Sequence, residues 1–388
     1  MNVIVFGGDH HNTLGVIRSL GRCGIMPDVL LHTRNANSKK GLLTSKYINS
    51  FKIVPSSEEG VEYLKTICEE GKKKIVICTS DDASSVIDQN RDCLLNYFFI
   101  PGCERQGEVT RLMNKKTMGE YASSVGLMVP RDVMVENCVI PTNVTFPCIT
   151  KPILSIEGSK DDIIVCKRRE ELESFLSKTN CLKFQLQQFI DKEFEYQLIG
   201  CSLDCGNSVI IPGRARILSQ PVCTNTGFLK YEHLDGTEPI EQCEKFLKGI
   251  QFSGLFSMEF LRGKDGKDYF MEINFRNDGN SISVTEAGVN LPYIWYAHCC
   301  NLDWQEKAQF DIKEIHVMPE YTEVGLWYIG DISFSRMIRE FRMTNFYMDY
   351  SKDDPMPTNG KLGLLACFVK YLIKKPLRML LKFLKLKR

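Results

Sequence analysis

Several common sequence features are missing from this chain. Its 49 Lys and Arg residues nearly balance 48 Asp and Glu residues, which leaves a formal net charge of +1. A chain so close to neutrality has no general attraction for polyanions, so no nucleic-acid partner is expected. None of the 16 cysteines stands in a CxxC pair or at a metal-finger spacing, which argues against the common structural zinc sites. The longest uninterrupted apolar run, LGLLACFV, is far below the ~18 residues that a membrane-spanning helix needs.

The cysteines and the first residues both bear on the compartment. Many thiols lie inside apolar runs such as IVICTS and YAHCC, where they are expected to act as small hydrophobes in a reducing environment. The chain starts with the strand-like NVIVFGG and has no basic segment followed by an apolar stretch, so a signal peptide is not predicted. A cytoplasmic location is therefore expected.

The first hundred residues have the pattern of an open parallel sheet. Apolar runs at 2–6, 27–33 and 73–80 predict buried strands, with helical segments such as 57–73 between them. Ligands of such sheets bind beyond the carboxyl ends of the strands, where GGD at 7–9 and TSDD at 79–82 would lie. The glycine pattern is not GxGxxG, which argues against an NAD-dependent oxidoreductase.

The pattern changes beyond residue 144. Helices are predicted within 105–130 and at 168–178 and 238–250. Short strands are predicted at 144–152, 162–167, 183–190, 194–201, 208–218, 254–262 and 269–276. Such a mixture is typical of an α+β or mixed-sheet domain, and 388 residues are enough for two or three domains.

The segment YFMEINFRNDGN at 269–280 carries the most chemistry. Alternation along a strand places Glu272, Asn274 and Arg276 on one face. A two-residue turn at 265–266 would make a hairpin in which Glu259 lies directly opposite Glu272. Like charges on Cβ atoms about 4.5 to 5.5 Å apart are destabilising, so something must offset them.

The residues alone leave open three ways in which the repulsion between Glu259 and Glu272 could be offset. The two carboxyl groups could share a proton, a neighbouring arginine could neutralise them, or a divalent cation could bind between them with Asn274 as a further oxygen ligand. A solvated polar face on an edge strand is the plain structural alternative.

The same residues resemble a known family. FSMEFL followed by MEINFR is similar to the magnesium-binding strands of the ATP-grasp superfamily. Three earlier segments occur in that family's order: MNKKTMGEYASSVGLMVPR resembles its entry helix, FPCITKP its phosphate-lysine strand, and FQLQQFIDKEFEYQL its adenine hinge and ribose-binding strand. GGDHHNTLGVIRSLGRCGI is most like the carboxylate–amine ligase branch, which includes carbamoyl-phosphate-synthase-like proteins and D-aspartate ligases. The resemblance covers about residues 1–300.

The resemblance implies an architecture of combined α/β and α+β class. It predicts a Rossmann-like pre-ATP-grasp domain at 1–104 and an ATP-grasp domain at 105–310. Within the latter, a small lid subdomain would span about 115–190 and precede a mixed-sheet ATP-binding subdomain. A C-terminal extension at 311–361 and a basic amphipathic tail at 362–388 would follow.

The resemblance also implies nucleotide contacts. Lys151 and Lys115, with Lys116 as the alternative to the latter, would meet the ATP phosphates. Glu193, or Glu195 on the same strand, would take the ribose hydroxyls. The residues expected to offer backbone groups to the adenine edge are Gln188, Phe189 and Ile190.

Metal and catalytic roles follow in the same way. The resemblance assigns magnesium, with manganese as a substitute, to Glu259, Glu272 and Asn274. Arg276 would meet the γ-phosphate or an acyl phosphate, and the expected catalytic residues are Arg276, Lys151 and Arg214.

Other charged residues have two readings. Arg214 and Arg216 share a strand face and could clamp a carboxylate or phosphate, or form a solvated basic face. His10, His11 and His233 have no partner at metal-ligand spacing and are interpreted as polar loop residues.

Two departures from the family pattern stand out. The flap segment SIEGSKDD holds a single glycine, whereas the family's flap is usually richer in glycine. The hinge has Gln188 where a glutamate is usual, a change that leaves backbone contacts to adenine intact.

The implied function is an ATP-dependent carboxylate–amine ligase that forms an acyl phosphate and passes it to an amine. The expected partners are ATP, magnesium and small-molecule carboxylates and amines, and the chain could form a homodimer. The alternative is a non-catalytic nucleotide-binding sensor or scaffold on the same fold.

The last 27 residues differ in charge from the rest. Residues 362–388 hold eight Lys or Arg and no acid, while the other 361 carry 41 basic and 48 acidic residues, a net charge of −7. A basic amphipathic segment of this kind favours the anionic inner face of a membrane, with a break expected near Pro376. A lipid-linked or cell-envelope substrate would suit that location. A C-terminal helix docked on the body of the protein is the alternative.

Overall fold

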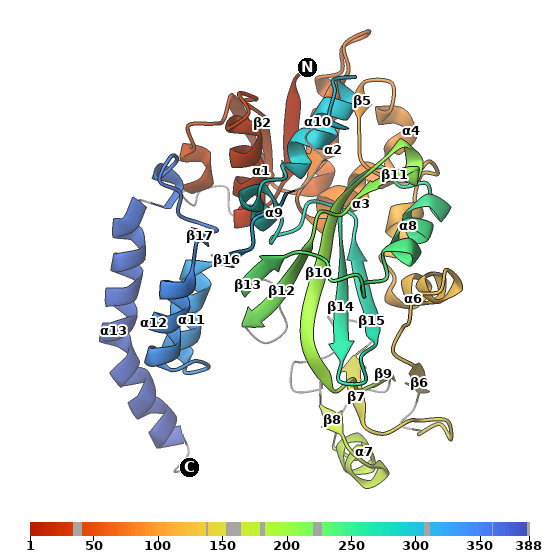
Figure 1. The fold of residues 1–388 in the computed structure, drawn as a ribbon, viewed down its shortest axis with the longest axis vertical. Coiled ribbons are helices and arrows are strands. Elements are labelled where there is room, and N and C mark those ends of the chain that lie inside the picture. Colours follow the sequence, from red (N-terminus) through yellow and green to blue (C-terminus); the bar gives the residue numbers. More distant parts are fainter. Residues whose placement is uncertain are drawn as a thin grey trace.

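Three β-sheets organise the part of the chain that the structure describes (Figure 1). The structure is a computed structural model, and it describes residues 1–33, 41–136, 139–152, 164–178, 183–219, 227–305, 311–358 and 360–385. The N-terminal sheet lies at one end of the molecule, the largest sheet at its centre and a small antiparallel sheet at the other end (Figure 1).

The N-terminal sheet is parallel throughout, as the sequence predicts. Its order is β3-β2-β1-β4-β5, with β1 at Val3–Gly7, β2 at Asp28–His32 and β4 at Lys74–Cys78. The pattern missed both edge strands, β3 at Ser50–Val54 and β5 at Phe98–Phe99. The first has exposed residues in place of an apolar run, and the second has only two residues.

Helices cover both faces of this sheet. Alternate residues of β1 pack against α1 (His11–Gly21) on one face, and against α2 (Ser57–Thr66) and α3 (Asp81–Gln89) on the other. The short helices α4 (Arg91–Leu94) and α5 (Glu108–Leu112) then lead to α6 (Lys115–Ser124). Loops and helix N-termini meet at the carboxyl ends of the strands, which the helices leave uncovered.

The small antiparallel sheet has its own core. Its order is β6-β9-β7-β8, formed by Asp132–Glu136, Lys183–Gln188, Cys148–Pro152 and Val165–Cys166. Helix α7 (Arg169–Leu176) contributes Leu172 and Leu176 to a hydrophobic cluster that the sheet shares. The chain passes directly from β9 into the largest sheet.

The largest sheet has eight strands. Its order is β15-β14-β10-β12-β13-β16-β17, and β11 pairs with β10. The strands up to β13 are Lys192–Leu203 (β10), Ser208–Ile210 (β11), Arg214–Ser219 (β12) and Phe228–Glu232 (β13). The remaining strands are Gly254–Gly263 (β14), Asp268–Asn274 (β15), Ile315–Met318 (β16) and Phe346–Tyr347 (β17). The run at 208–218, expected to be one strand, is divided into β11 and β12, and β13, β16 and β17 were not predicted.

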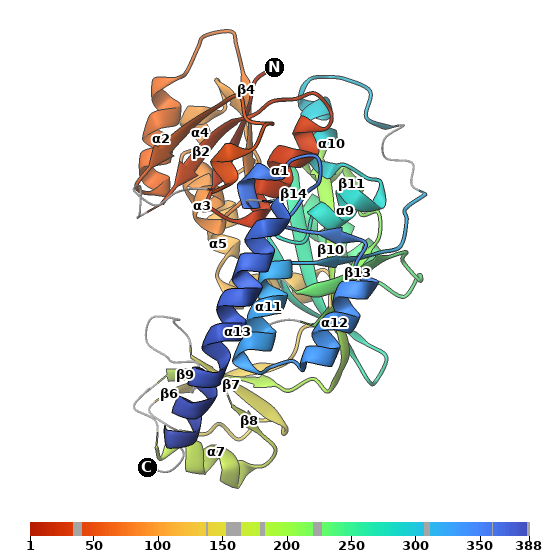
Figure 2. The same ribbon diagram turned by 90° about the vertical axis from the view of Figure 1, so that its left-hand side faces the viewer.

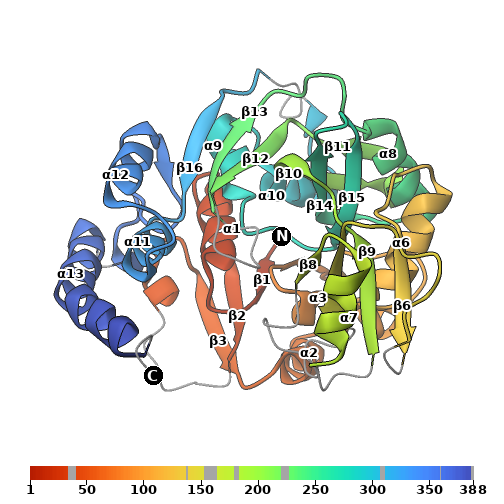
Figure 3. The same cartoon turned by 90° about the horizontal axis from the view of Figure 1, so that it is seen from below.

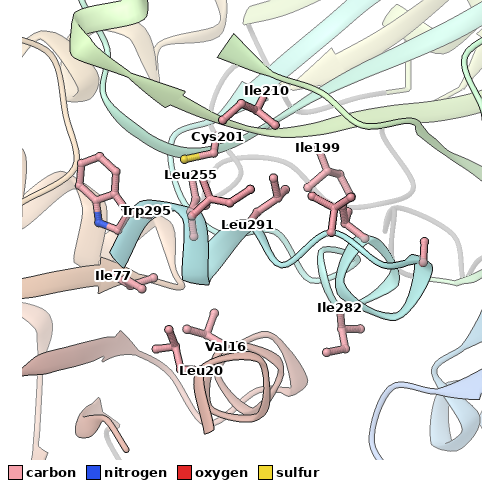
Figure 4. Packing of buried hydrophobic residues seen from close by; sticks show 14 of the residues in the cluster. Val16, Leu20, Ile77, Ile199, Cys201, Ile210, Leu255, Ile282, Leu291 and Trp295 are labelled. Carbon is pink, nitrogen blue, oxygen red and sulfur yellow. The ribbon is translucent and has the colours of Figure 1, made fainter. Parts of the chain in front are cut away.

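The two faces of the largest sheet bury different layers. Helix α8 (Ile240–Gly249) and α6 pack on one face through an aromatic cluster. Helices α9 (Ile282–Ala287) and α10 (Leu291–Cys299) pack on the other, where Ile199, Leu255 and Trp295 meet Val16 of α1 and Ile77 of β4 (Figure 4). This shared core fixes the N-terminal sheet against the largest sheet.

Three helices complete the chain. α11 (Glu320–Ile329) and α12 (Phe334–Met343) lie between the largest sheet and α13 (Gly360–Lys385), which runs along the outside of the molecule (Figures 2 and 3). The expected break near Pro376 is wrong, because α13 continues through it. A proline can remain inside a helix at the expense of one backbone hydrogen bond. Among the described residues, no helix has both the length and the apolar content needed to cross a bilayer.

Candidate active site

The two glutamates predicted to oppose each other do so in the β14–β15 hairpin. Glu259 is the cross-strand partner of Glu272. The predicted two-residue turn at 265–266 is nevertheless wrong. The Gly263 amide donates to the Lys267 carbonyl at 2.8 Å and closes a loop of three residues. With this loop alone, the two glutamates would be out of register by one residue.

A β-bulge restores the register. The pairing shifts between Glu259 and Phe260, which leaves Met271 as the extra residue on β15. Because of the bulge, Phe270 joins the aromatic core with Phe260 while Glu272, two residues on, does not. Bulges are common beside active sites because they re-aim a side chain in this way.

Amide side chains surround the carboxylate of Glu259. Gln197 Nε2 and Asn274 Nδ2 lie 3.2 and 3.1 Å from the same Glu259 oxygen, Oε1. Glu259 is only 8% exposed, whereas Glu272 is partly open and lies 3.6 Å from the Lys115 ammonium. The protein therefore provides amide donors to the buried carboxylate and an ammonium to the accessible one.

Negative charge is concentrated at this point. Burial, followed by the nearby carboxylates of Glu272 and Asp278, holds the pKa of Glu259 well above its usual range. A raised pKa means that the ionised form is unstable in the site as it stands. A bound cation would reverse that effect.

Arg276 lies between the largest sheet and the N-terminal sheet. Its guanidinium binds Asp81 bidentately, with Nε to Oδ1 at 2.7 Å and Nη2 to Oδ2 at 3.1 Å. Its Nη1 lies 3.7 Å from Asp278, and its Nη2 donates to the Asn274 oxygen at 3.2 Å. Burial lowers the pKa of Arg276, but the surrounding carboxylates outweigh it and raise the pKa. Arg276 is therefore a fixed, charged group beside the acidic pair.

The N-terminal sheet presents its carboxyl-end loops at the same place. Asn12 Nδ2 donates to the carbonyls of Thr79 and Asn277 at 2.8 and 2.6 Å, and the Asn277 amide donates to Cys78 at 3.0 Å. The start of α1 and the carboxyl end of β4 thus contact the segment that follows β15. As expected from the sequence, the residues beyond the carboxyl ends of β1 and β4 lie together, and they adjoin Arg276.

The two candidate lysines at the start of α6 differ in position. Asn114 caps this helix by accepting from the amides of residues 116 and 117. Lys115 lies within 3.6 Å of Glu272, whereas Lys116 lies 3.9 Å from Glu120 on its own helix. The structure therefore brings Lys115, and not Lys116, to the acidic pair.

The segment 188–190, which was expected to contact adenine, uses some of its backbone groups for hydrogen bonds within the protein. The Gln188 amide donates to the Arg131 carbonyl at 2.7 Å, and the Phe189 amide donates to the Pro147 carbonyl at 2.9 Å. Ile190 is buried. The amides of Gln188 and Phe189 are therefore engaged, and their carbonyls and the backbone of Ile190 are the groups left to consider for a nucleotide.

The remaining nucleotide candidates lie on β7 and β10. Lys151 belongs to β7 and pairs with Gln185, but its side chain lies outside the described residues, as does the flap SIEGSKDD. Glu193 is exposed at an irregularity of β10. Glu195 shares a face with the centre of the site and forms an ion pair with Lys192.

Arg214 lies on the opposite face of the sheet from the acidic pair. Its cross-strand partner is Leu198, whereas Glu259 pairs with Gln197, and successive residues point to opposite faces. Its guanidinium makes ion pairs of 2.6 to 2.9 Å with Glu232, Asp235 and Glu238. The expected catalytic role of Arg214 is therefore contradicted, and so is the alternative of a solvated face. Its neighbour Arg216 lies over the ring of Phe194 at 4.6 Å.

The histidines have structural surroundings. His10 Nδ1 accepts from the Asn12 amide at the start of α1, and its ring lies 3.8 Å from that of His11. Burial, and then the proximity of His10, lower the pKa of His11 to about 3, so this ring is neutral at physiological pH. His233 is exposed.

Four polar residues of the site were missed by the sequence analysis. They form a hydrogen-bonded set in which Ser257 bonds Asp278, and Asn280 bonds both Asp278 and Gln197, at distances from 2.7 to 3.0 Å. Gln197 could have been found, because it follows Glu193 and Glu195 at alternate positions of one strand. No sequence pattern links Asp81 to Arg276, which are 195 residues apart.

The donor set fits a divalent cation. Glu259, Glu272 and Asn274 bring two carboxylates and one amide to neighbouring strand positions. Among the described residues, no group of three or more His, Cys, Asp or Glu side chains could hold a metal by itself. A set with so few protein ligands suits magnesium, which completes its shell with phosphate oxygens and water.

Comparisons with known proteins were informative at the level of structure. No family model matches the sequence, and no curated protein matches it significantly. An L-amino acid ligase from Bacillus licheniformis superposes with a TM-score of 0.59 at 15% identity, over 81% of this chain and 78% of that one. An N5-carboxyaminoimidazole synthetase from Staphylococcus aureus, solved with ADP, gives 0.60 at 16% identity over 86% of each chain. A biotin carboxylase domain from Hydrogenobacter thermophilus, solved with MgADP and bicarbonate, gives 0.59 at 15% identity, over 79% and 72%.

This chain has the ATP-grasp fold. The fold class predicted from the sequence is confirmed, with a parallel N-terminal sheet, a small antiparallel sheet and a large mixed sheet. Within this fold the acidic pair lies on the largest sheet, and the chain passes directly from β9 into that sheet.

Proposed function

We propose that the protein is an ATP-dependent carboxylate–amine ligase. The observation that carries this proposal is the opposed pair of Glu259 and Glu272, placed on an ATP-grasp fold beside the fixed cation Arg276. Opposed carboxylates repel each other, and a divalent cation bound together with a polyphosphate would offset that repulsion.

In this proposal, ATP lies between the small antiparallel sheet and the largest sheet. Lys115 and Lys151 neutralise its phosphates, the hinge backbone around Ile190 contacts adenine, and Glu193 or Glu195 binds the ribose. Mg²⁺, or Mn²⁺ in its place, would be held by Glu259, Glu272 and Asn274 and would supply charge neutralisation on the phosphates.

Two substrates then react in turn. An oxygen of the substrate carboxylate attacks the γ-phosphorus, and the bond to ADP breaks to give an acyl phosphate. Arg276 stabilises the charge on the transferred phosphoryl group. The amine attacks the acyl carbon and loses a proton, and phosphate leaves with the electrons of the C–O bond. The carboxyl-end loops of the N-terminal sheet, next to Arg276, are the proposed walls for the carboxylate.

Further parts of the proposal concern organisation and location. The proposed domains are a pre-ATP-grasp domain at 1–104 and an ATP-grasp domain at 105–310, with a lid at about 115–190. A C-terminal extension at 311–361 and a basic tail at 362–388 follow. We place the protein in the cytoplasm, with the basic tail on the inner face of the membrane and a cell-envelope or polysaccharide precursor as the substrate. A homodimer is the proposed assembly. The charge of residues 362–388 supports the membrane location.

The test combines trapping with a matched pair of variants. The protein is incubated with ATP, magnesium, hydroxylamine and pools of carboxylates, and hydroxamate and ADP are measured. Glu272→Gln is expected to lower both products more than 100-fold without any loss of thermal stability, because it removes one of two charges that repel each other. Glu241→Gln, an exposed residue paired with Lys245 on α8, serves as the control and should retain full activity.

Two outcomes would contradict the ligase. Tight ATP binding without ADP formation in any pool would favour a nucleotide-binding sensor. Equal ADP formation by the Glu272→Gln and wild-type proteins would remove the acidic pair from the reaction.

A further inference from the structure

Helix α13 has two apolar faces, and one of them packs on the body. Phe368 stacks on Trp327 of α11 with ring centroids 5.2 Å apart, and Tyr371 stacks on Tyr328 at 4.4 Å. Lys375 lies 4.1 Å from the ring of Trp327 and donates to the carbonyl of that residue. The described part of α13 is thus fixed on the protein, which agrees with the docked-helix alternative.

The other face of α13 is uncovered and apolar. Its residues are exposed by 42 to 75%: Leu362 75%, Leu365 57%, Val369 42%, Leu372 51% and Ile373 72%. Their spacing of three, four, three and one residues places them along one side of a helix. We call these five residues the outward stripe. Single exposed hydrophobic residues are ordinary, but a continuous row over three turns marks a binding surface.

An aromatic residue of α12 extends this surface. Phe334 is 51% exposed, and its ring lies 6.4 Å from that of Phe368, which borders the outward stripe at Leu365 and Leu372. The apolar surface therefore spans two helices that pack on the same hydrophobic cluster.

The charges beside the stripe are all positive. Within the bounds of α13 there are seven Lys or Arg and no Asp or Glu. Lys370 and Lys374 are exposed, and helical spacing sets Lys370 one turn before Ile373 on the flank of the stripe. Apolar residues flanked by lysines are the pattern of a helix that lies in the surface of an anionic membrane.

We propose that the outward stripe is a membrane-binding surface that inserts into the headgroup region of anionic lipids, with Lys370 and Lys374 on the phosphates. A second copy of the chain is a poorer occupant, because pairing two such helices would bring two sets of seven positive charges together. Outside residues 362–388, the net charge of −7 repels the same lipids. The asymmetry orients the protein with α13 toward the membrane.

This inference deepens the membrane association proposed above by assigning it to one helix face, and it is independent of the ligase chemistry. Vesicle flotation of the full chain tests it. Vesicles of phosphatidylcholine alone are compared with vesicles that contain phosphatidylglycerol, at low and high salt. The wild-type protein is expected to float with the anionic vesicles at low salt only.

Three double variants locate the surface. Leu365→Gln with Ile373→Gln should lower recovery on anionic vesicles at least tenfold, because it removes apolar area that enters the lipid. Lys370→Gln with Lys374→Gln should lower recovery and weaken its dependence on salt. The matched control, Phe51→Gln with Met128→Gln, changes two other exposed hydrophobic residues and should leave recovery unchanged. All four residues of the α13 variants are exposed, so thermal unfolding should not change.

The outcomes separate the two levels of the proposal. If the wild-type protein stays with the unbound fraction on anionic vesicles, membrane association itself is wrong. If it floats and the stripe variant floats equally well, the association is real but the assigned face is wrong. If light scattering shows a dimer that the stripe variant converts to a monomer, without any flotation, the stripe is a contact between two copies. ADP formation without vesicles should be the same for all of these proteins.

Discussion

At the residue scale, the side chains around Glu259 partly offset the repulsion between two opposed carboxylates. Two opposed carboxylates repel each other, and one of them is buried. Gln197 and Asn274 lie at hydrogen-bond distance from Glu259, and Lys115 lies near Glu272, yet the pKa of Glu259 remains raised by burial and by Glu272. A carboxyl group whose pKa is raised by burial and by a neighbouring acid is typical of a functional site.

At the same scale, Asp81 is expected to position Arg276. It is the bidentate partner of that guanidinium and comes from the N-terminal part of the chain. Asp81→Asn would remove the charge that holds Arg276 in its orientation, and we expect kcat for ADP formation to fall about tenfold to a hundredfold with a smaller change in KM for ATP. Steady-state kinetics measures the two constants separately.

The control for this variant is Asp92→Asn, an exposed aspartate in the first turn of α4. It should keep kcat within twofold of the wild type. Equal values for Asp81→Asn and Asp92→Asn would contradict the positioning role.

At the scale of elements, the β14–β15 hairpin reached the predicted pairing by a different route. The loop has one residue more than the two-residue turn assumed from the sequence, and the bulge at Met271 compensates for it. Gly266 has a φ of +76°, which the last position of a three-residue hairpin loop requires. Alternation alone would have put Phe270 and Glu272 on one face, so the separation of core from site depends on the bulge.

The α11–α12 pair carries a buried acidic contact with a consequence for stability. Glu323 is 1% exposed, and its carboxylate has no hydrogen-bond donor among the described residues. Burial, and then the adjacent Glu340 carboxyl group, raise the pKa of Glu323 to about 8. Between the ordinary pKa of glutamate and this value, the folded state holds a proton that the unfolded state has lost. The free energy of unfolding should therefore fall as the pH rises through that range.

Glu323→Gln should remove this pH dependence. At pH 8 we expect the variant to be more stable than the wild type by on the order of 2 kcal/mol. The carboxyl group of Glu323 ionises more readily in the unfolded state, which favours unfolding of the wild type, whereas an amide does not ionise in either state. Urea unfolding at pH 6 and pH 8 measures the difference. Glu173→Gln, an exposed residue of α7, should change stability by less than about 0.5 kcal/mol at both pH values. A variant with the pH dependence of the wild type would show that Glu323 is ionised in the folded protein.

At the scale of the whole molecule, one buried arginine connects the two ends of the chain. Arg18 of α1 is fully buried, pairs with Asp354 at 3.1 Å and also donates to the carbonyls of residues 348, 349 and 354. The segment after β17 is therefore held against α1, and α13 begins only a few residues later.

Arg18→Gln should loosen that connection. Removal of one partner from a buried ion pair leaves the other uncompensated, and we expect a loss of about 3 to 5 kcal/mol in the free energy of unfolding. Denaturant unfolding and limited proteolysis of the C-terminal helices measure it. Arg111→Gln changes an exposed arginine paired with Glu108 and should cost less than about 1 kcal/mol. Similar losses in both variants would mean that Arg18 does not hold the C-terminal segment.

Prediction from the sequence succeeded where the signal was local. The apolar runs of β1, β2 and β4 and the helices near 169–176 and 240–249 followed from periodicity. The pairing of the two glutamates was also predicted, but from a two-residue turn that the structure replaces with a longer loop and a bulge. It failed for β3, β13, β16 and β17, whose sequences do not form distinct apolar runs. The face of Arg214 was also beyond prediction, because it depends on the register of β12 against β10.

The sequence by itself determined the parallel N-terminal sheet and the alternation of Glu272 and Asn274 on one strand face, because hydrophobic periodicity and residue chemistry act over a few positions. Only the tertiary structure decided that Asp81 holds Arg276, that Arg214 is excluded from the acidic pair and that one face of α13 is left uncovered. These outcomes depend on strand register and on which helix faces meet across long separations. Packing of the whole chain sets both, and no local pattern encodes them.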